Sequence, residues 1–221
     1  MDISRRLCEI WAEIPDRMRL VAVSKFHPAS LIKEAYDAGQ RIFGESRVQE
    51  MRSKYDELPK DIIWHFIGHL QTNKVRDIAP FVDMIESVDS LRLLREINLQ
   101  GEKINRKINV LLQIHIAAEE TKFGFTFEEC RRILSSEEIH NMKNICICGL
   151  MGMATFTDNQ SQVRSEFAGL AGFFREIKRF FFENVPEFRE LSMGMSDDYL
   201  LAIEEESTLI RIGSKLFGQR N

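Results

Sequence analysis

The chain has 221 residues, of which 44% are hydrophobic and 29% are charged. This is the composition of an ordinary globular protein, and it excludes a disordered or fibrous chain. With 30 Lys and Arg residues against 34 Asp and Glu residues, the net charge is -4. We therefore expect no dedicated nucleic-acid surface, because such a surface needs an excess of basic residues.

The N-terminal stretch carries Asp2 and lacks the basic and apolar regions of a secretory signal. No apolar run approaches the roughly 20 residues that cross a bilayer, so we expect no membrane segment. The cysteines have neither C-x-x-C nor zinc-ligand spacing, and we expect them to be small buried side chains. Cys146 and Cys148 are two apart in an apolar run, so both face one side of a strand. These features favour a cytoplasmic protein with reduced thiols.

In chain order, a helix is predicted over residues 4–14, and a short apolar run followed by an amphipathic stretch then recurs along the chain. Several runs are apolar at successive positions, which is typical of strands buried on both faces of a parallel sheet. The eight predicted strands span residues 20–24, 41–44, 62–68, 84–88, 108–116, 145–154, 191–195 and 209–213.

Helices are predicted between these strands, among them 29–38, 90–99 and 160–182. The last has a stripe of Phe residues at helical spacing, including Phe167 and Phe174, which we interpret as core packing. Eight strands alternating with seven helices favour a single (β/α)8 TIM-type barrel over residues 1–221 with an extra N-terminal helix. An open doubly wound sheet is the alternative. Neither a G-x-G-x-x-G nor a P-loop motif is present.

Functional groups of such barrels gather at the carboxyl ends of the strands, and phosphate often binds after strands 7 and 8. Lys25 directly follows the first strand, where desolvation lowers the pKa of an amine and makes it a nucleophile that forms Schiff bases with carbonyl compounds. A lysine that merely extends into solvent is the alternative. Ser192, Ser196 and Ser214 supply hydroxyl donors, and Gly213 lets backbone N–H groups approach an anion.

Ser196 is followed by two aspartates, so we predict that it is a helix N-cap that places an anion near the positive end of a helix dipole. The amine after strand 1 and the phosphate cup after strands 7 and 8 are neighbours only if the barrel closes. Together they predict a site for an aldehyde that carries a phosphate.

Five motifs resemble the pyridoxal phosphate homeostasis protein family, which has the barrel of the alanine racemase N-terminal domain and binds pyridoxal 5′-phosphate (PLP). They are VAVSK (21–25), FGESRVQE (43–50), WHFIGHLQTNK (64–74), SMGMSDD (192–198) and RIGSKLFG (211–218). The resemblance implies that Lys25 forms a Schiff base with the cofactor. It also implies that Ser196, Gly213 and Ser214 hold the phosphate with Ser192 nearby, and that Arg211 faces the pyridine nitrogen.

An arginine only donates hydrogen bonds, so it keeps the pyridine nitrogen unprotonated and disfavours carbanion chemistry. A surface ion pair is the alternative role for Arg211. Two positions depart from the family pattern: Ser46 stands where Asn is common, and His69 where Pro is common. The serine is shorter, so a contact made by the Asn amide is lost or bridged by water. His65 and His69 flank a strand end, which argues against a metal pair, and Lys122 is either a secondary acceptor for the cofactor or a solvated loop lysine.

Two functions compete. In the first, the protein is a cofactor reservoir that buffers PLP and delivers it to PLP-dependent apoenzymes without robust turnover. In the second, it is a PLP-dependent amino-acid racemase-like enzyme, but the chain stops seven residues after Ser214, without the second domain of alanine racemase, and Tyr36, Tyr55 and Tyr199 offer no obvious second base. A Schiff-base aldolase without a cofactor is a third, weaker hypothesis. No heptad seam predicts assembly, so we expect a monomer.

Overall fold

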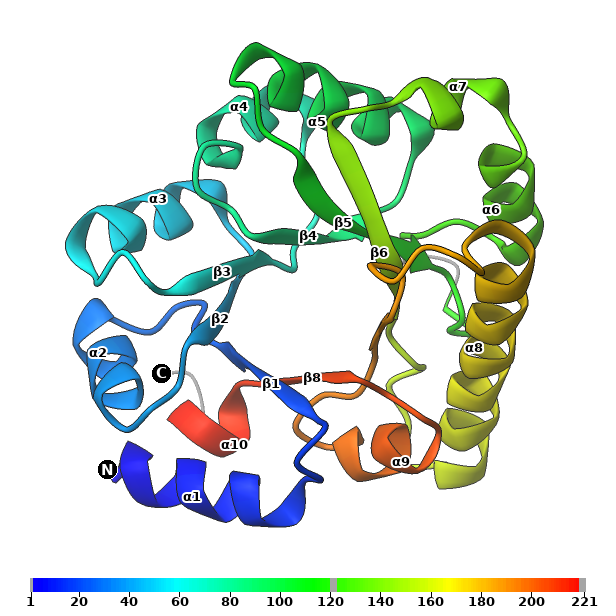
Figure 1. Cartoon of the computed structure of the whole chain (residues 1–221). Coiled ribbons are helices and arrows are strands. Elements are labelled where there is room, and N and C mark those ends of the chain that lie inside the picture. The colour runs from blue at the N-terminus through cyan, green and yellow to red at the C-terminus, as the bar shows by residue number, and fades with distance from the viewer. Residues whose placement is uncertain (1, 120–122, 219–221) are drawn as a thin grey trace.

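Parallel strands that follow one another around a closed barrel form the centre of the computed structural model, which describes residues 2–119 and 123–218. Within these residues, the eight strands pair in sequence order, and β8 pairs with β1 to close the ring (Figure 1). The strands are β1 (Arg19–Val23), β2 (Ile42–Glu45), β3 (Ile63–Phe66), β4 (Met84–Val88), β5 (Ile108–Ile114), β6 (Ile145–Gly152), β7 (Glu190–Ser192) and β8 (Leu209–Ile212). The predicted barrel is confirmed, and the open sheet is excluded.

Helices surround this barrel and connect successive strands, so the apolar faces of both are buried against each other (Figure 1). They are α1 (Ile3–Glu13), α2 (Ala29–Asp37), α3 (Val48–Glu57), the 3-10 helix η1 (Thr72–Lys74), α4 (Val75–Ile78), α5 (Leu91–Lys103), α6 (Phe127–Leu134), α7 (Glu137–Asn141), α8 (Gln160–Phe181), α9 (Tyr199–Glu204) and α10 (Ser214–Phe217). None of the helices among the described residues combines the length and apolar character that a membrane span requires.

The predicted N-terminal helix is confirmed as α1, which lies beside β1 and α10 (Figure 1). Asp2 caps this helix by accepting a hydrogen bond from the Arg5 backbone N–H at 2.9 Å. The buried face of α1 includes Ile3, Leu7 and Ile10, and the Arg6 guanidinium donates to the Leu216 carbonyl of α10 at 3.3 Å. The helix therefore covers the seam between β8 and β1, as the barrel hypothesis expected.

Two apolar clusters hold the barrel together. The larger lies between strands and helices and includes Phe167 and Leu170 of α8, so the predicted core role of the Phe stripe is confirmed. The smaller lies inside the barrel and consists of Val21, Met84, Leu111, Cys146, Cys148, Met151 and Leu209. Cys146 and Cys148 thus share one face as predicted. Cys8 is exposed, so the expectation of buried cysteines is wrong for that residue, which lies on the solvent side of α1.

Candidate functional site

The carboxyl ends of β1 and β8 lie side by side, and this brings the first and last motifs together. Ala22 pairs with Ile212 across the two strands, and a Cβ on Gly213 would lie 3.3 Å from both the Cβ and the carbonyl oxygen of Val23. The half-buried Lys25 follows two residues after Val23. The structure therefore places the end of β1, from which the chain continues to Lys25, beside the Gly213 turn, and the position of the Lys25 amine itself stays a prediction.

Ser196 lies in the loop after β7 and reaches the same turn. Its Oγ accepts hydrogen bonds from the backbone N–H groups of Gly213 at 3.3 Å and Lys215 at 3.4 Å. Ser214 stands between these two donors and is exposed. Hydroxyl and backbone donors from two strand ends thus converge at one point, which is the kind of donor set that an anion requires.

The prediction that Ser196 is a helix N-cap is wrong. Helix α9 begins at Tyr199 with Asp198 as its N-cap residue, and it is only six residues long. The Asp198 carboxylate instead closes the loop by accepting the Met195 backbone N–H at 2.5 Å. The two aspartates after Ser196 suggest a capping sequence, but Asp198 accepts a hydrogen bond within the loop. The Ser196 hydroxyl instead contacts the backbone at the end of β8.

Gly194 gives this loop its shape. Its φ of +91° lies in the region that only glycine adopts easily, and an added Cβ would lie 2.6 Å from the Cβ of Ala202. The Gly194 carbonyl also accepts the Arg211 backbone N–H at 3.0 Å, which joins the loop to β8. This glycine therefore lets the loop pack closely against α9, two residues before Ser196.

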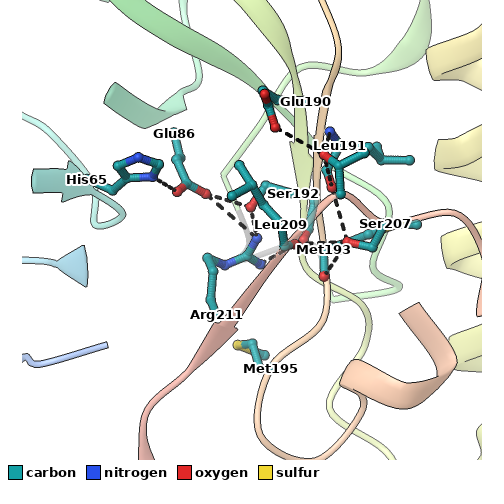
Figure 2. Close-up of polar contacts among 12 residues, drawn as sticks. His65, Glu86, Glu190, Leu191, Ser192, Met193, Met195, Ser207, Leu209 and Arg211 are labelled. Carbon is teal, nitrogen blue, oxygen red and sulfur yellow. Dashed lines mark hydrogen bonds and ion pairs between the residues drawn. The ribbon is translucent and has the colours of Figure 1, made fainter. Parts of the chain in front are cut away.

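Arg211 is buried inside the barrel, so the alternative of a surface ion pair is wrong. Its Nη1 donates to Ser192 Oγ at 2.5 Å, and its Nη2 donates to the Gly152 carbonyl at 3.0 Å. Ser192 in turn donates to Glu86 Oε2 at 2.6 Å, and the same carboxylate oxygen lies 3.9 Å from Arg211 Nη1. Figure 2 shows this chain of contacts running from Arg211 through Ser192 to Glu86 and His65.

Glu86 is the counter-charge of this buried network. Its Oε1 lies 2.6 Å from His65 Nδ1, and both side chains are almost completely excluded from solvent. Burial by itself raises the pKa of Glu86, but the hydrogen bond from His65, the charges of His65 and Arg211, and the Ser192 hydroxyl together hold that pKa below its ordinary value. Burial lowers the pKa of Arg211, and the charges of Glu86 and Asp198 oppose this effect.

The other predicted residues lie at the strand ends but outside this network. Ser46 is half-buried directly after β2, with its backbone so close to Gly68 that a Cβ there would lie 2.4 Å from the Ser46 carbonyl oxygen. His69 stacks on Phe123 with ring centroids 4.5 Å apart, and its Nδ1 lies 3.1 Å from Asp89. In the part of the chain that the structure describes, no group of three metal-ligating side chains could hold an ion. Lys122 lies outside the described residues.

Sequence reasoning missed Glu86 and the role of His65. Glu86 is the third residue of β4, whose five residues are all buried. A carboxylate in a strand that is buried along its whole length costs free energy unless it is paired, so Glu86 is a signal that the sequence alone offers. Its partners were not detectable, because His65, Ser192 and Arg211 come from three other strands.

Known proteins share this barrel. A family model for the N-terminal domain of alanine racemase matches residues 3–221, which defines the class of the domain. The pyridoxal phosphate homeostasis protein of Aquifex aeolicus is 37% identical over 217 residues, which cover 98% of this chain and 93% of that protein. The human pyridoxal phosphate homeostasis protein is 39% identical over 215 residues, covering 92% and 77%. The chain belongs to the pyridoxal phosphate homeostasis protein family, which confirms the resemblance of its five motifs.

Solved structures agree. PipY of Synechococcus elongatus without PLP superposes with a TM-score of 0.90, and the same protein with PLP bound superposes with a TM-score of 0.87. Both are 37% identical, and each comparison covers 98% of this chain and 100% of that one. An alanine racemase of Clostridium difficile 630 is 15% identical with a TM-score of 0.77, and this chain covers 56% of it. That likeness concerns the fold alone.

Proposed function

We propose that this protein binds PLP reversibly as a Schiff base with Lys25 and serves in PLP homeostasis, buffering the cofactor and delivering it to PLP-dependent apoenzymes without robust turnover. The observation that carries the proposal is that β1, which leads directly into Lys25, ends beside the Gly213 turn at the end of β8. The PLP bound to the related PipY supports it.

The residues present at these strand ends fit the chemistry of PLP. Its phosphate is an anion that suits the Ser196 and Ser214 hydroxyls, and it would also accept from the Gly213 and Lys215 N–H groups once it replaced Ser196 Oγ as their acceptor. We assign Ser192 to holding Arg211, and Ser46 to the neighbouring edge of the site at the end of β2. When bound, PLP supplies an aldehyde for condensation with an amine and a ring that accepts electrons.

Lys25 contributes the amine. Its Nζ, once deprotonated, would supply the amine that condenses with the aldehyde carbon, and the two protons of that amine would leave with the carbonyl oxygen as water. Hydrolysis reverses this condensation and releases the aldehyde, as a reservoir of the cofactor requires. A covalent but hydrolysable link holds the reactive aldehyde away from other amines and releases it unchanged.

Arg211 supports a carrier rather than an enzyme. A guanidinium has five N–H donors, and its contacts with Ser192 and Gly152 use Nη1 and Nη2 for one bond each, so it keeps the capacity to donate to a ring nitrogen. A nitrogen that accepts this bond stays unprotonated, and the ring then withdraws electrons weakly. Proton removal from an amino acid is disfavoured under these conditions.

The tyrosines weigh against a racemase-like enzyme, the second candidate. Tyr36 donates to Asp61 at 2.7 Å, and Tyr55 stacks on Phe81 with centroids 4.0 Å apart. Tyr199 is buried and donates to Glu13. Each of the three tyrosine side chains thus makes a structural contact of its own, which argues against its acting as the second catalytic base of a racemase.

One experiment tests the proposal. The purified protein is loaded with PLP, its visible absorbance is recorded, and the complex is reduced with borohydride and analysed by mass spectrometry. We expect absorbance of a Schiff base and a phosphopyridoxyl group on Lys25. A protein that cannot be loaded, or a label on another lysine, contradicts the proposed site. Deuterium exchange at Cα of amino acids at enzyme-like rates contradicts the carrier role, and light scattering tests the proposed monomer.

A further inference from the structure

One lysine and two glutamates form a buried charge cluster beside the end of β1. Lys54 Nζ of α3 lies 2.6 Å from Glu45 Oε1 of β2 and 2.6 Å from Glu50 Oε1 of its own helix. The side chains of Lys54, Glu45 and Glu50 are only 7%, 0% and 20% exposed. Charges buried to this degree are costly, so their arrangement calls for an explanation beyond stability.

The cluster lies between the barrel and its helices rather than inside the barrel. Gly44 faces the interior, since a Cβ there would lie 2.9 Å from Val21 of the inner cluster. The next residue, Glu45, therefore faces outward, toward α3. The cluster is thus separated by the wall of the barrel from the Arg211 network.

From that side the cluster holds the backbone on both sides of Lys25. Before it, Lys54 Nζ donates to the Ser24 carbonyl at 2.8 Å, and Ser24 Oγ donates to Glu45 Oε1 at 2.6 Å. After it, the Phe26 backbone N–H donates to Glu50 Oε1 at 2.6 Å. The residues that precede and follow Lys25 are thus bound by side chains from two other elements.

Phe26 shows that this backbone needs support. Its φ of +67° lies in the left-handed region, which a non-glycine residue occupies only when its surroundings hold it there. Burial raises the pKa of Glu45, against the opposing charge and hydrogen bond of Lys54, so the carboxylate depends on its lysine partner. The left-handed Phe26 is thus held by the Glu50 carboxylate, and Lys54 offsets the cost of burying Glu45.

We infer that Glu45, Glu50 and Lys54 are positioning residues that fix the backbone around Lys25 and so set the direction from which its amine meets an aldehyde. The inference rests on the proposed function. It predicts that imine formation and phosphate binding respond separately to mutation. The proposed phosphate cup lies at the ends of β7 and β8, whereas the cluster contacts only the end of β1. Loss of the cluster slows imine formation and leaves phosphate binding intact.

The test uses the full chain and two probes. PLP reports imine formation through its absorbance in stopped flow, and pyridoxine 5′-phosphate, an alcohol that cannot form an imine, reports binding to the cup by calorimetry. The variants are Glu50→Ala, which removes the acceptor of the Phe26 N–H, Glu50→Gln, which keeps a carbonyl acceptor, and Lys54→Met. Lys33→Met is the matched control, because it removes an exposed ion pair with Asp37 on α2.

We expect Glu50→Ala and Lys54→Met to slow imine formation at least about tenfold, because small misplacements of a reacting group have large effects on rate. Glu50→Gln should restore most of the rate, Lys33→Met should match the parent chain, and all should bind pyridoxine 5′-phosphate as the parent does. A folded Glu50→Ala chain with the parent rate overturns the inference, and so does a parallel loss of pyridoxine 5′-phosphate affinity. A parent chain that forms no imine overturns the proposed function itself, and the inference with it.

Discussion

Glu86 and Arg211 lie 3.9 Å apart inside the barrel, and the hydroxyl of Ser192 links them by a hydrogen bond on each side. The pair allows a guanidinium to remain charged where solvent is excluded. Arg211 is the group proposed to face the pyridine ring of the cofactor, so the same contacts that hold it in place also stabilise the fold.

Glu86→Gln is expected to destabilise the protein by about 3–5 kcal/mol, because it removes the carboxylate that lies 3.9 Å from the buried Arg211 guanidinium. Urea unfolding followed by circular dichroism measures the effect. Glu138→Gln serves as the control, since Glu138 pairs with Arg95 on the surface, and no measurable change is expected there. Equal losses in the two variants contradict the proposed importance of the buried pair.

The acid limb of the stability curve should depend on the same carboxylate. Glu86 has a pKa below its ordinary value of 4.5, so its contribution is complete above that pH and is lost as the pH falls through the lower folded-state value. We expect the free energy of unfolding of the parent protein to decrease as the pH drops below about 4.5. The free energy of unfolding of Glu86→Gln should decrease less steeply with pH over the same range. Urea titrations at a series of pH values measure both slopes, and identical slopes contradict this assignment.

Two glycines should respond to alanine in opposite directions. Gly194→Ala places a side chain at a φ of +91° and against Ala202, so a loss of about 1–3 kcal/mol or more is expected. Gly169 lies in the exposed middle of α8 with open space around it, and Gly169→Ala should stabilise the protein by about 0.5–1 kcal/mol. Thermal unfolding compares the two, and a stable Gly194→Ala chain contradicts the structural role of that loop.

Ser196→Ala should weaken PLP and pyridoxine 5′-phosphate equally. The hydroxyl is proposed to bind the phosphate, and a hydrogen bond to a charged group contributes about 1.5–3 kcal/mol, which is roughly ten- to a hundredfold in affinity. Calorimetry with both ligands measures the loss, with Ser135→Ala after α6 as an exposed control. A loss confined to PLP would place Ser196 near the aldehyde instead of the phosphate.

Much of this architecture could be predicted because continuous apolar strands carry a strong local signal. Lys25 and Gly213 could be placed together from barrel closure alone, since the first and last strands of a closed sheet must be neighbours. The partners of Arg211 could not, because a strand pattern does not reveal which inward-facing side chains of β3, β4 and β7 meet. Lys54 shows the same limit, since a lysine in a helix is ordinarily solvated and nothing local marks it as buried.

The seam between β1 and β8 has a consequence for the synthesis of the protein. Residues near the two ends of the described chain must pair before the barrel closes, and α1 can dock on α10 only after β8 has formed. During synthesis on the ribosome, Lys25 is therefore added to the chain long before Gly213. The proposed site needs both ends of the chain, so it is complete only in a chain whose barrel has closed.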